Sequence, residues 1–134
     1  MTQLADQGAD RSAYIYVVLR VAPNVEREEF INVGVVLYCR ARRFLDARVA
    51  LNRARLYALA PNLDAATVTL IQAHLELVPQ ICTGRGPIGQ LAQPERFRWL
   101  AAPRSTMLQT SDTHGGLCGD PRAALEHLFE ILVK

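Results

Sequence analysis

The chain of 134 residues has almost no lysine. Lysine and arginine together number 15, and Lys134 is the only lysine. An arginine bias suits recognition of phosphate or carboxylate groups, because the planar guanidinium donates two parallel hydrogen bonds. The simpler explanation is a GC-rich genome, whose codons favour arginine and alanine over lysine. The net charge of +2 is too small to indicate nucleic-acid binding by itself.

Long hydrophobic runs are also missing. No stretch of about 18 apolar residues occurs, so the sequence predicts no membrane-spanning helix. Residues 1–12 lack the apolar core of a secretory signal and are predicted to form a flexible lead. The cysteines Cys39, Cys82 and Cys118 are odd in number and widely spaced. They predict reduced thiols and a cytoplasmic location rather than a disulfide framework.

No catalytic or metal-binding signature stands out. Residues 83–90, TGRGPIGQ, lack the Gly-Lys-Ser/Thr ending of a phosphate-binding loop, and they follow a predicted helix. His114 and Cys118 are four residues apart, but a zinc site needs three or four ligands and no paired spacing supplies the others. Nucleophilic catalysis by a cysteine with a histidine is left undetermined, because any such pair can meet in space. We therefore expect no metal and no cofactor, and we favour a non-enzyme.

What the chain does contain is the pattern of one packed domain. Half of its residues are hydrophobic and 21% are charged, and its length suits a single core. Residues 13–21, 31–39 and 44–51 alternate with the period of two that half-buried strands require. Each strand is predicted to have one mixed face and one aliphatic face. The aliphatic faces are Ile15, Val17, Leu19 and Val21, then Ile31, Val33, Val35 and Leu37, then Leu45, Ala47, Val49 and Leu51.

Helix signals follow these strands. Asn52, Asp64 and Asp120 each precede an apolar periodic segment and are expected to cap it. Pro121 suits a first helical position, and Pro79 is expected to end or kink its helix. The sequence therefore predicts a single α+β domain over 13–134, a mainly antiparallel sheet with helices packed on one face, the aliphatic one. Helices are predicted at 53–60, 65–79, 95–101 and from 121 onwards, a short strand at 106–110, and loops at 83–94 and 111–119.

The densest polar segment connects the first two predicted strands. Arg20, Glu28, Glu29 and Asn32 form a candidate polar cluster there. A hydrolase or nuclease that uses loop 26–32 requires a carboxyl group whose pKa is raised by burial. We favour a structural or surface role: a solvated turn with a local ion pair, or a turn carboxylate that pairs with Arg20 and fixes the strand connection.

A basic segment follows the second predicted strand. Arg40, Arg42 and Arg43 form a candidate surface patch that can contact phosphates. Aromatic residues on the mixed sheet face give it a faint likeness to a base-stacking platform, although their spacing matches no ribonucleoprotein signature. These aromatic residues are Tyr14, Tyr16, Tyr38 and Phe44.

One family resemblance is specific. Residues 14–40, YIYVVLRVAPNVEREEFINVGVVLYCR, with LQTS at 108–111 and the helix that starts at Asp120, resemble the uncharacterised bacterial family filed as domain of unknown function 3037. The distinctive part is EREEFINVGV at 26–35. The resemblance implies no established activity. It does imply a regulatory partner of a HipA-like kinase, because members are often encoded beside one.

The resemblance also singles out positions to test. The family motif falls on Arg20, Glu28, Glu29, Asn32 and Gly34. After LQTS the sequence reads DTHGGLCGD, where the family pattern has a basic residue, and this departure weakens an anion-binding role for that loop.

These observations favour a non-catalytic protein-interaction or regulatory module, with a kinase-like protein as the implied partner. A small nuclease or hydrolase that uses residues 26–32 is one alternative, and a nucleic-acid-binding protein is another. An open sheet edge or apolar patch would permit a homodimer.

Overall fold

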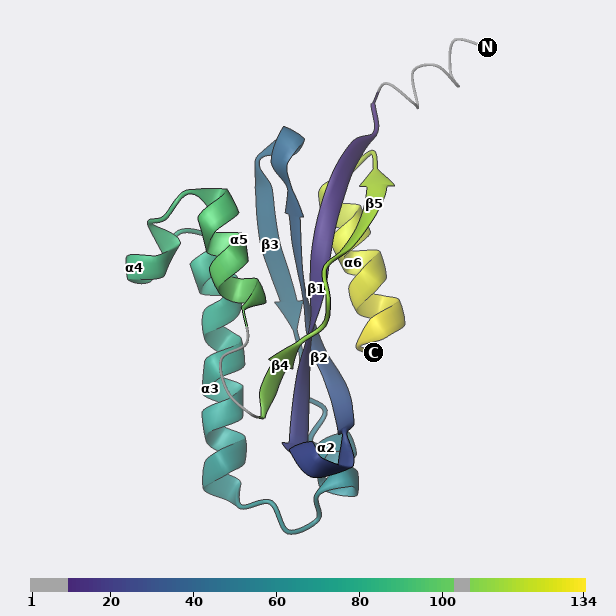
Figure 1. Ribbon diagram of the computed structural model, residues 1–134, viewed down its shortest axis with the longest axis vertical. Coiled ribbons are helices and arrows are strands. Elements are labelled where there is room, and N and C mark those ends of the chain that lie inside the picture. Colours follow the sequence, from purple (N-terminus) through teal and green to yellow (C-terminus); the bar gives the residue numbers. More distant parts are fainter. Residues whose placement is uncertain (1–9, 103–106) are drawn as a thin grey trace.

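The computed structural model describes residues 10–102 and 107–134 (Figure 1). Residues 1–9, most of the predicted flexible lead, lie outside this range, as does Thr106 of the predicted short strand. The described part contains no helix long and apolar enough to cross a membrane. The elements in chain order are β1 (Ser12–Asn24), η1 (Val25–Arg27), β2 (Glu29–Cys39), η2 (Arg40–Arg42), β3 (Phe44–Val49), α2 (Arg53–Leu59), α3 (Ala65–Cys82), α4 (Gly86–Gly89), α5 (Gln93–Ala101), β4 (Leu108–Thr110), β5 (His114–Cys118) and α6 (Pro121–Leu132).

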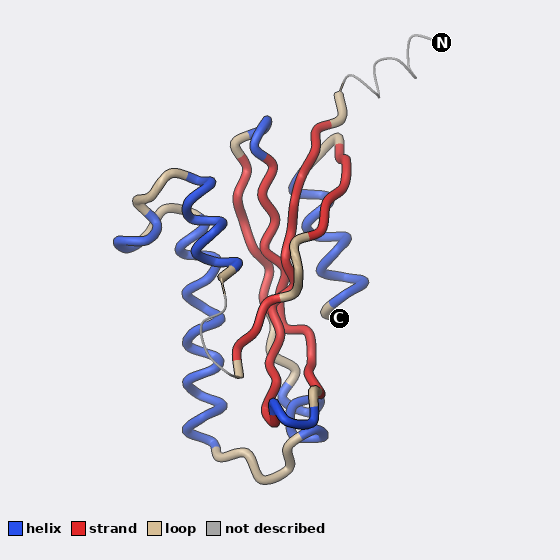
Figure 2. Tube along the Cα trace, in the orientation of Figure 1, coloured by secondary structure: helices blue, strands red, loops and turns tan. Residues whose placement is uncertain are grey.

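The five strands form one antiparallel sheet, which confirms the predicted single α+β domain. The order is β3-β2-β1-β4, and β5 also pairs with β1. β1 is long enough, at 13 residues, to hold β4 along one half and β5 along the other (Figure 2). Residues 114–118 were predicted as loop because of their glycines, and they form a strand because β1 offers them a free edge.

Helices cover both faces of this sheet rather than one. α3 and α5 lie on one side of it and α6 lies on the other (Figure 1). The larger core joins β1, β2 and β3 to α3 and α5, as predicted for the aliphatic face. The smaller core packs Leu125 and Phe129 of α6 against Val35 and Leu37 of β2.

The second core exists because β2 changes face at Gly34. Leu19 pairs with Gly34 and Arg20 pairs with Asn32, so Val33 is an extra residue in β2. Such a β-bulge shifts the alternation by one position. Val36 and Tyr38 therefore face the larger core, and Val35 and Leu37 face α6, which is the reverse of the predicted faces for this half of the strand. The faces of the residues after the bulge could not be predicted from period-two alternation alone, because apolar residues occupy both faces of the strand there.

The predicted helix starts are confirmed by their caps. The side chains of Asn52, Asp64 and Asp120 accept hydrogen bonds from backbone amides of the first turn, at 3.1, 2.9 and 3.0 Å. Pro79 does not end α3, which continues to Cys82. Only one short turn follows the proline, so its missing donor affects a single bond near the helix end.

Candidate functional site

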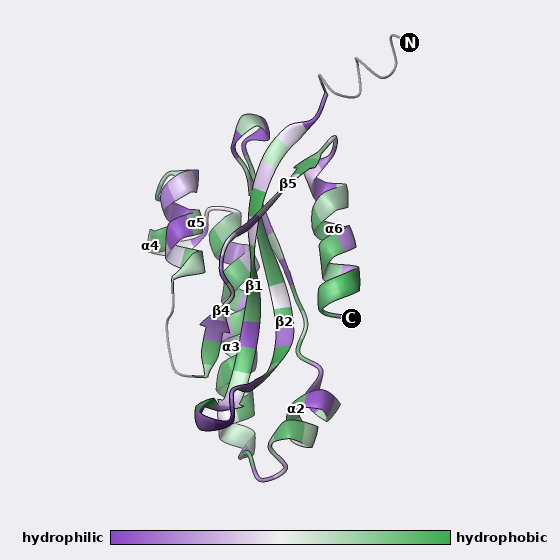
Figure 3. Cartoon of the chain, turned by 45° about the vertical axis from the view of Figure 1, so that its right-hand side comes forward, coloured by the Kyte–Doolittle hydropathy of each residue, from purple (hydrophilic) through white to green (hydrophobic). Residues whose placement is uncertain are grey.

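α6 is too short to cover its face of the sheet. A helix of 12 residues spans about 18 Å, whereas 13 residues of strand span about 43 Å. α6 packs on the middle of β2 and on β3. The end of the sheet at the β1–β2 hairpin is left without a helix on this face. Figure 3 shows hydrophilic positions on adjacent parts of β1 and β2, within otherwise hydrophobic strands.

A row of three polar side chains crosses this uncovered end. Arg20 of β1 lies opposite Asn32 of β2 and also opposite Gln109 of β4. Directly opposed residues of antiparallel strands share a face of the sheet. The three side chains therefore emerge on the α6 face, beyond the last turn of that helix.

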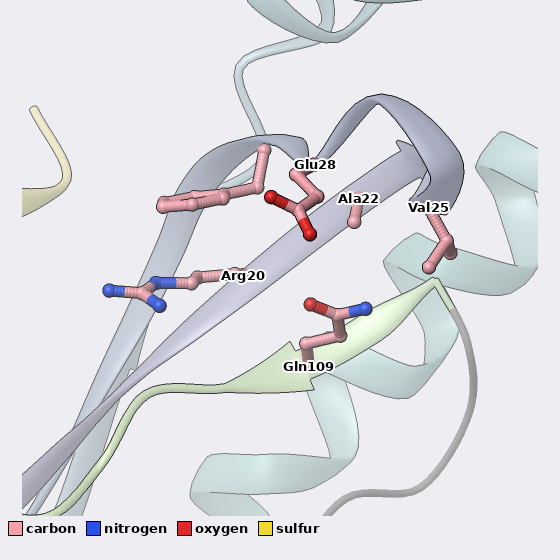
Figure 4. A pocket seen from close by; sticks show the side chains of 6 residues that line it. Arg20, Ala22, Val25, Glu28 and Gln109 are labelled. Atoms are coloured by element: carbon pink, nitrogen blue, oxygen red, sulfur yellow. The ribbon is translucent and has the colours of Figure 1, made fainter.

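A pocket of about 380 Å³ lies above this row. Ala22, Val25 and Phe30 contribute apolar lining, and Arg20, Glu28 and Gln109 contribute polar lining. Figure 4 shows the side chains of Glu28 and Gln109 extending into the same space, beside the stem of Arg20. The pocket thus combines a cation and an anion from the β1–β2 hairpin with an amide from β4, a segment distant in sequence.

Arg20 is held in the pocket by an aromatic ring and not by an anion of the described residues. Its guanidinium carbon lies 4.3 Å from the centroid of the Phe30 ring, a cation–π geometry. Its Nε is buried and has no hydrogen-bond partner among the described residues. No carboxylate of the described residues forms an ion pair with Arg20. The predicted pairing of Arg20 with a carboxylate of the turn is therefore not formed within this part of the chain.

The glutamates of the turn point in different directions. Glu28 has a left-handed backbone conformation, with φ of 55°, and its side chain lines the pocket. Glu29 pairs instead with Arg27, and both side chains of that pair are largely exposed. Glu26 is exposed as well. The structure thus brings Arg20 and Glu28 to one pocket and leaves Glu29 outside it.

Asn32 lies beside Arg20 but has a structural partner. Its Nδ2 donates a hydrogen bond of 3.0 Å to the carbonyl oxygen of Leu132. Its Oδ1 is buried without a partner among the described residues. The amide therefore anchors the end of α6 at the border of the pocket.

The basic patch does not combine with an exposed aromatic platform. Arg40, Arg42 and Arg43 are exposed in the β2–β3 turn, where the Nε of Arg42 donates to the Oγ of Ser12 at 3.1 Å. Tyr38 is buried under α5, with its ring stacked 5.8 Å from that of Phe97. Tyr14 and Tyr16 pack against the core beneath α6.

The described cysteines are free and buried. Burial raises the pKa of the Cys118 thiol above its ordinary value, and the nearby Cys39 thiol raises this pKa further. β5 and β2 flank β1 on opposite sides, which separates their backbones by about 9.5 Å. A disulfide needs Cα atoms about 4.4–6.8 Å apart, so this pair cannot be bridged without movement of the backbone. No group of three or more His, Cys, Asp or Glu side chains in the described ranges is placed to hold a metal ion.

Phe30 and Gln109 are not among the residues predicted from the sequence. Phe30 had a detectable signal, since it is an aromatic residue two positions from Asn32 in a strand, and so on the same polar face. No sequence signal pointed to Gln109, because its place beside Arg20 depends on pairing between segments that are almost 90 residues apart.

Comparison with known proteins gives one match. The family model described as "Protein of unknown function (DUF3037)" matches residues 16–133. No curated protein and no solved structure matches the chain.

Proposed function

Since the chain belongs to the DUF3037 family, in which no activity is assigned, we propose from its own geometry that it is a protein-interaction module whose Arg20 pocket holds a carboxylate of a partner protein. The observation that carries this proposal is the environment of Arg20. One face of its guanidinium is covered by Phe30, its Nε is buried without a partner, and no described carboxylate forms an ion pair with it.

A carboxylate is the natural complement of this group. The guanidinium fork matches two carboxylate oxygens, and hydrogen bonds between charged partners are stronger than neutral ones. A buried donor without an acceptor costs about 1–3 kcal/mol. Nε has almost no accessible surface, so an acceptor reaches it only when covering groups such as the Phe30 ring move aside, and the bond then removes this cost.

Glu28 and the apolar lining narrow the class of ligand. A carboxylate on the other side of the pocket repels a simple anion, but it accepts hydrogen bonds from backbone amides or an ammonium group. Val25 and Phe30 are 43% and 45% exposed and offer apolar contact at the rim. These features fit an acidic residue within a peptide segment, which presents a carboxylate, amide donors and neighbouring apolar groups together.

The family resemblance supplies the proposed partner, a HipA-like kinase, and the three cysteines favour a cytoplasmic setting. The nuclease or hydrolase alternative is not favoured, because Glu28 lines the pocket alone among the three glutamates of the turn. Nucleic-acid binding is not favoured either, because Tyr38 is buried under α5 and Tyr14 and Tyr16 are partly buried against the α6 core.

Recognition of a ligand carboxylate by the Arg20 pocket is tested by NMR titration of the full chain with N-acetyl-glutamate amide. The Nε–Hε signal of Arg20 should shift, with a dissociation constant on the order of 1 mM, as expected for a single side chain. The neutral N-acetyl-glutamine amide should leave the signal unchanged. Equal shifts with both probes would count against carboxylate recognition.

Two variants make the test specific. Arg20→Gln removes the guanidinium from the pocket, and Arg53→Gln makes the same change of charge at an exposed site on α2. Only Arg20→Gln should abolish the shifts of pocket residues by N-acetyl-glutamate amide. Calorimetry with a HipA-like kinase from the same organism should then show at least tenfold weaker binding for Arg20→Gln alone; unchanged affinity would place the interface elsewhere.

A further inference from the structure

β5 is an edge strand with an unprotected outer side. It pairs with β1, and no described strand lies beyond it. Its residues are His114, Gly115, Gly116, Leu117 and Cys118, without a formal charge or a proline. Leu117 is 65% exposed, which makes it the most exposed of the large hydrophobic residues of the described chain. Natural edge strands are usually protected by charges, proline or bulges, because their free backbone groups pair readily with another strand.

The opposite edge of the sheet is different. β3 carries Asp46 and Arg48, and both form ion pairs with side chains of α6. Charged residues on an edge strand disfavour pairing with a second sheet. The contrast between the two edges indicates that β5 is the edge at which the sheet can be extended.

We propose that β5 pairs antiparallel with β5 of a second copy of this chain, about a two-fold axis at Gly116, so that one sheet continues across the dimer. In this register Gly116 faces Gly116 of the second copy, and Leu117 faces Gly115 of the second copy. This surface is separate from the Arg20 pocket, and the inference does not depend on the function proposed for that pocket.

The register follows from the alternation of strands. On an edge strand, every second residue directs its backbone N–H and C=O groups outward. Two identical antiparallel strands align these groups only when the axis passes through a residue rather than between two residues. Gly116 is the central residue of β5, so this axis aligns all five residues of each copy.

The side chains on one face of the extended sheet fit this register. Leu117 lies opposite Ala13, and Gly115 lies opposite Ile15, in the β1–β5 pairing. Across the axis, Leu117 therefore meets the gap left by Gly115 and reaches Ile15 of the second copy. Ile15 is itself 37% exposed. Because the dimer is two-fold symmetric, it covers Leu117 and Ile15 of both copies.

The other face fits as well. A Cβ atom at Gly116 would lie 2.5 Å from the Oη of Tyr14, so the Tyr14 ring extends over Gly116 toward the edge. The two rings then lie on either side of the axis, above the paired glycines. A second copy is favoured over an unrelated strand because β5 complements itself: it has no charge to repel, and its exposed leucine matches its own glycine.

Sedimentation velocity over a concentration series tests the dimer. The full chain should show a monomer–dimer equilibrium that is weak, because one strand edge buries a small interface. Leu117→Asp should raise the dissociation constant about tenfold or more, since it removes two buried leucines and places two charges in the interface. A monomer at every concentration would overturn the proposal.

A matched control is available on α3. Leu70 is 63% exposed, nearly the same as Leu117, and it lies on a helix far from β5 in the fold (Figure 1). Leu70→Asp should leave the dissociation constant unchanged. Loss of the dimer in Leu70→Asp but not in Leu117→Asp would assign the interface to α3 and overturn the proposal.

Cysteine cross-linking tests the register. Gly115→Cys and Leu117→Cys should form a disulfide-linked heterodimer under mild oxidation when the two variants are mixed, because these positions are directly opposed. Each variant alone should cross-link much less, because its two introduced cysteines are offset along the strands. The native chain, whose described cysteines are buried, is the background control. A dimer that cross-links better in either single variant than in the mixture would exclude the register at Gly116.

Discussion

The side-chain amide of Asn32 donates a 3.0 Å hydrogen bond to the carbonyl of Leu132, across 100 residues of sequence. The last carbonyls of a helix lack partners within the helix, and this bond supplies one while fixing α6 against β2. Asn32→Ala should therefore lower the free energy of unfolding by about 1–2 kcal/mol in urea denaturation. Asn62→Ala, at an exposed turn, is the control and should change it much less. Equal effects would show that the bond to Leu132 contributes nothing.

Gly34→Ala should be more damaging than a usual glycine-to-alanine change. Its Cβ would lie 2.9 Å from Val49 Cγ1 and 3.0 Å from the carbonyl oxygen of Arg48. Part of this contact is backbone, which cannot rotate away, so we expect a loss of about 1–3 kcal/mol in the free energy of unfolding. Gly119→Ala meets no atom within 4 Å and is the matched control. Urea denaturation of both variants measures the two losses. A larger loss for Gly34→Ala than for Gly119→Ala indicates a steric role for Gly34, and equal losses indicate an effect of backbone freedom alone.

α6 should be held by its buried ring more than by its ion pairs. Glu126 pairs with Arg48 and Arg122, but all three side chains are about half exposed, so Glu126→Gln should cost about 0.2–1 kcal/mol. Phe129 is buried, and Phe129→Ala should cost about 3–5 kcal/mol. Chemical denaturation at low and high salt measures both, and only the smaller effect should shrink with salt. The reverse ranking would mean that α6 docks electrostatically.

The start of α3 should make stability depend on pH. Hydrogen bonds from Thr67 lower the pKa of the Asp64 carboxyl below its ordinary value. A lowered pKa in the folded state adds stability above the ordinary pKa, and this contribution disappears as the pH falls through the lowered value. The Tm difference between the native chain and Asp64→Ala should be roughly 2–6 °C near neutral pH.

Thermal melts from pH 7 down to pH 2 provide the check. The Tm difference between the native chain and Asp64→Ala should narrow only at the acid end of this range, because protonation of Asp64 weakens the cap of the native chain there. Asp64→Asn keeps an acceptor without a titrating group, so its Tm should follow that of the native chain at neutral pH with a weaker fall in acid. A difference that is constant down to pH 2 would rule out titration of Asp64 as its source.

The sequence predicted the elements better than their arrangement. Period-two alternation and capping residues identify local structure, and β1, β2, β3 and the caps at Asn52, Asp64 and Asp120 were found in this way. The face that α6 covers was not predicted, because the bulge at Val33 exchanges the two sides of β2 while every residue after it remains apolar.

The candidate site was predicted only in part, because sequence patterns report local pairing and not contacts between distant strands. Arg20, Glu28 and Asn32 lie within one hairpin, so their proximity follows from local pairing. Gln109 joins them through β4, and no short-range pattern specifies which residue of a distant strand lies beside Arg20. Glu29 was predicted as part of the family motif, but it begins β2 and pairs with Arg27, whereas Glu28 lies in the left-handed turn before that strand.

The position of β1 has a consequence for how the chain folds. β1 is the first strand, yet one of its two edges is completed by β4 and β5, and its Val18 amide bonds to Ser111, 93 residues away. A nascent chain can form the β1–β2 and β2–β3 hairpins as soon as they leave the ribosome. It must then close a loop of almost the whole domain, a high contact order that slows folding. Until that step the apolar edge of β1 is open to other chains, which makes aggregation during synthesis the main hazard for this fold.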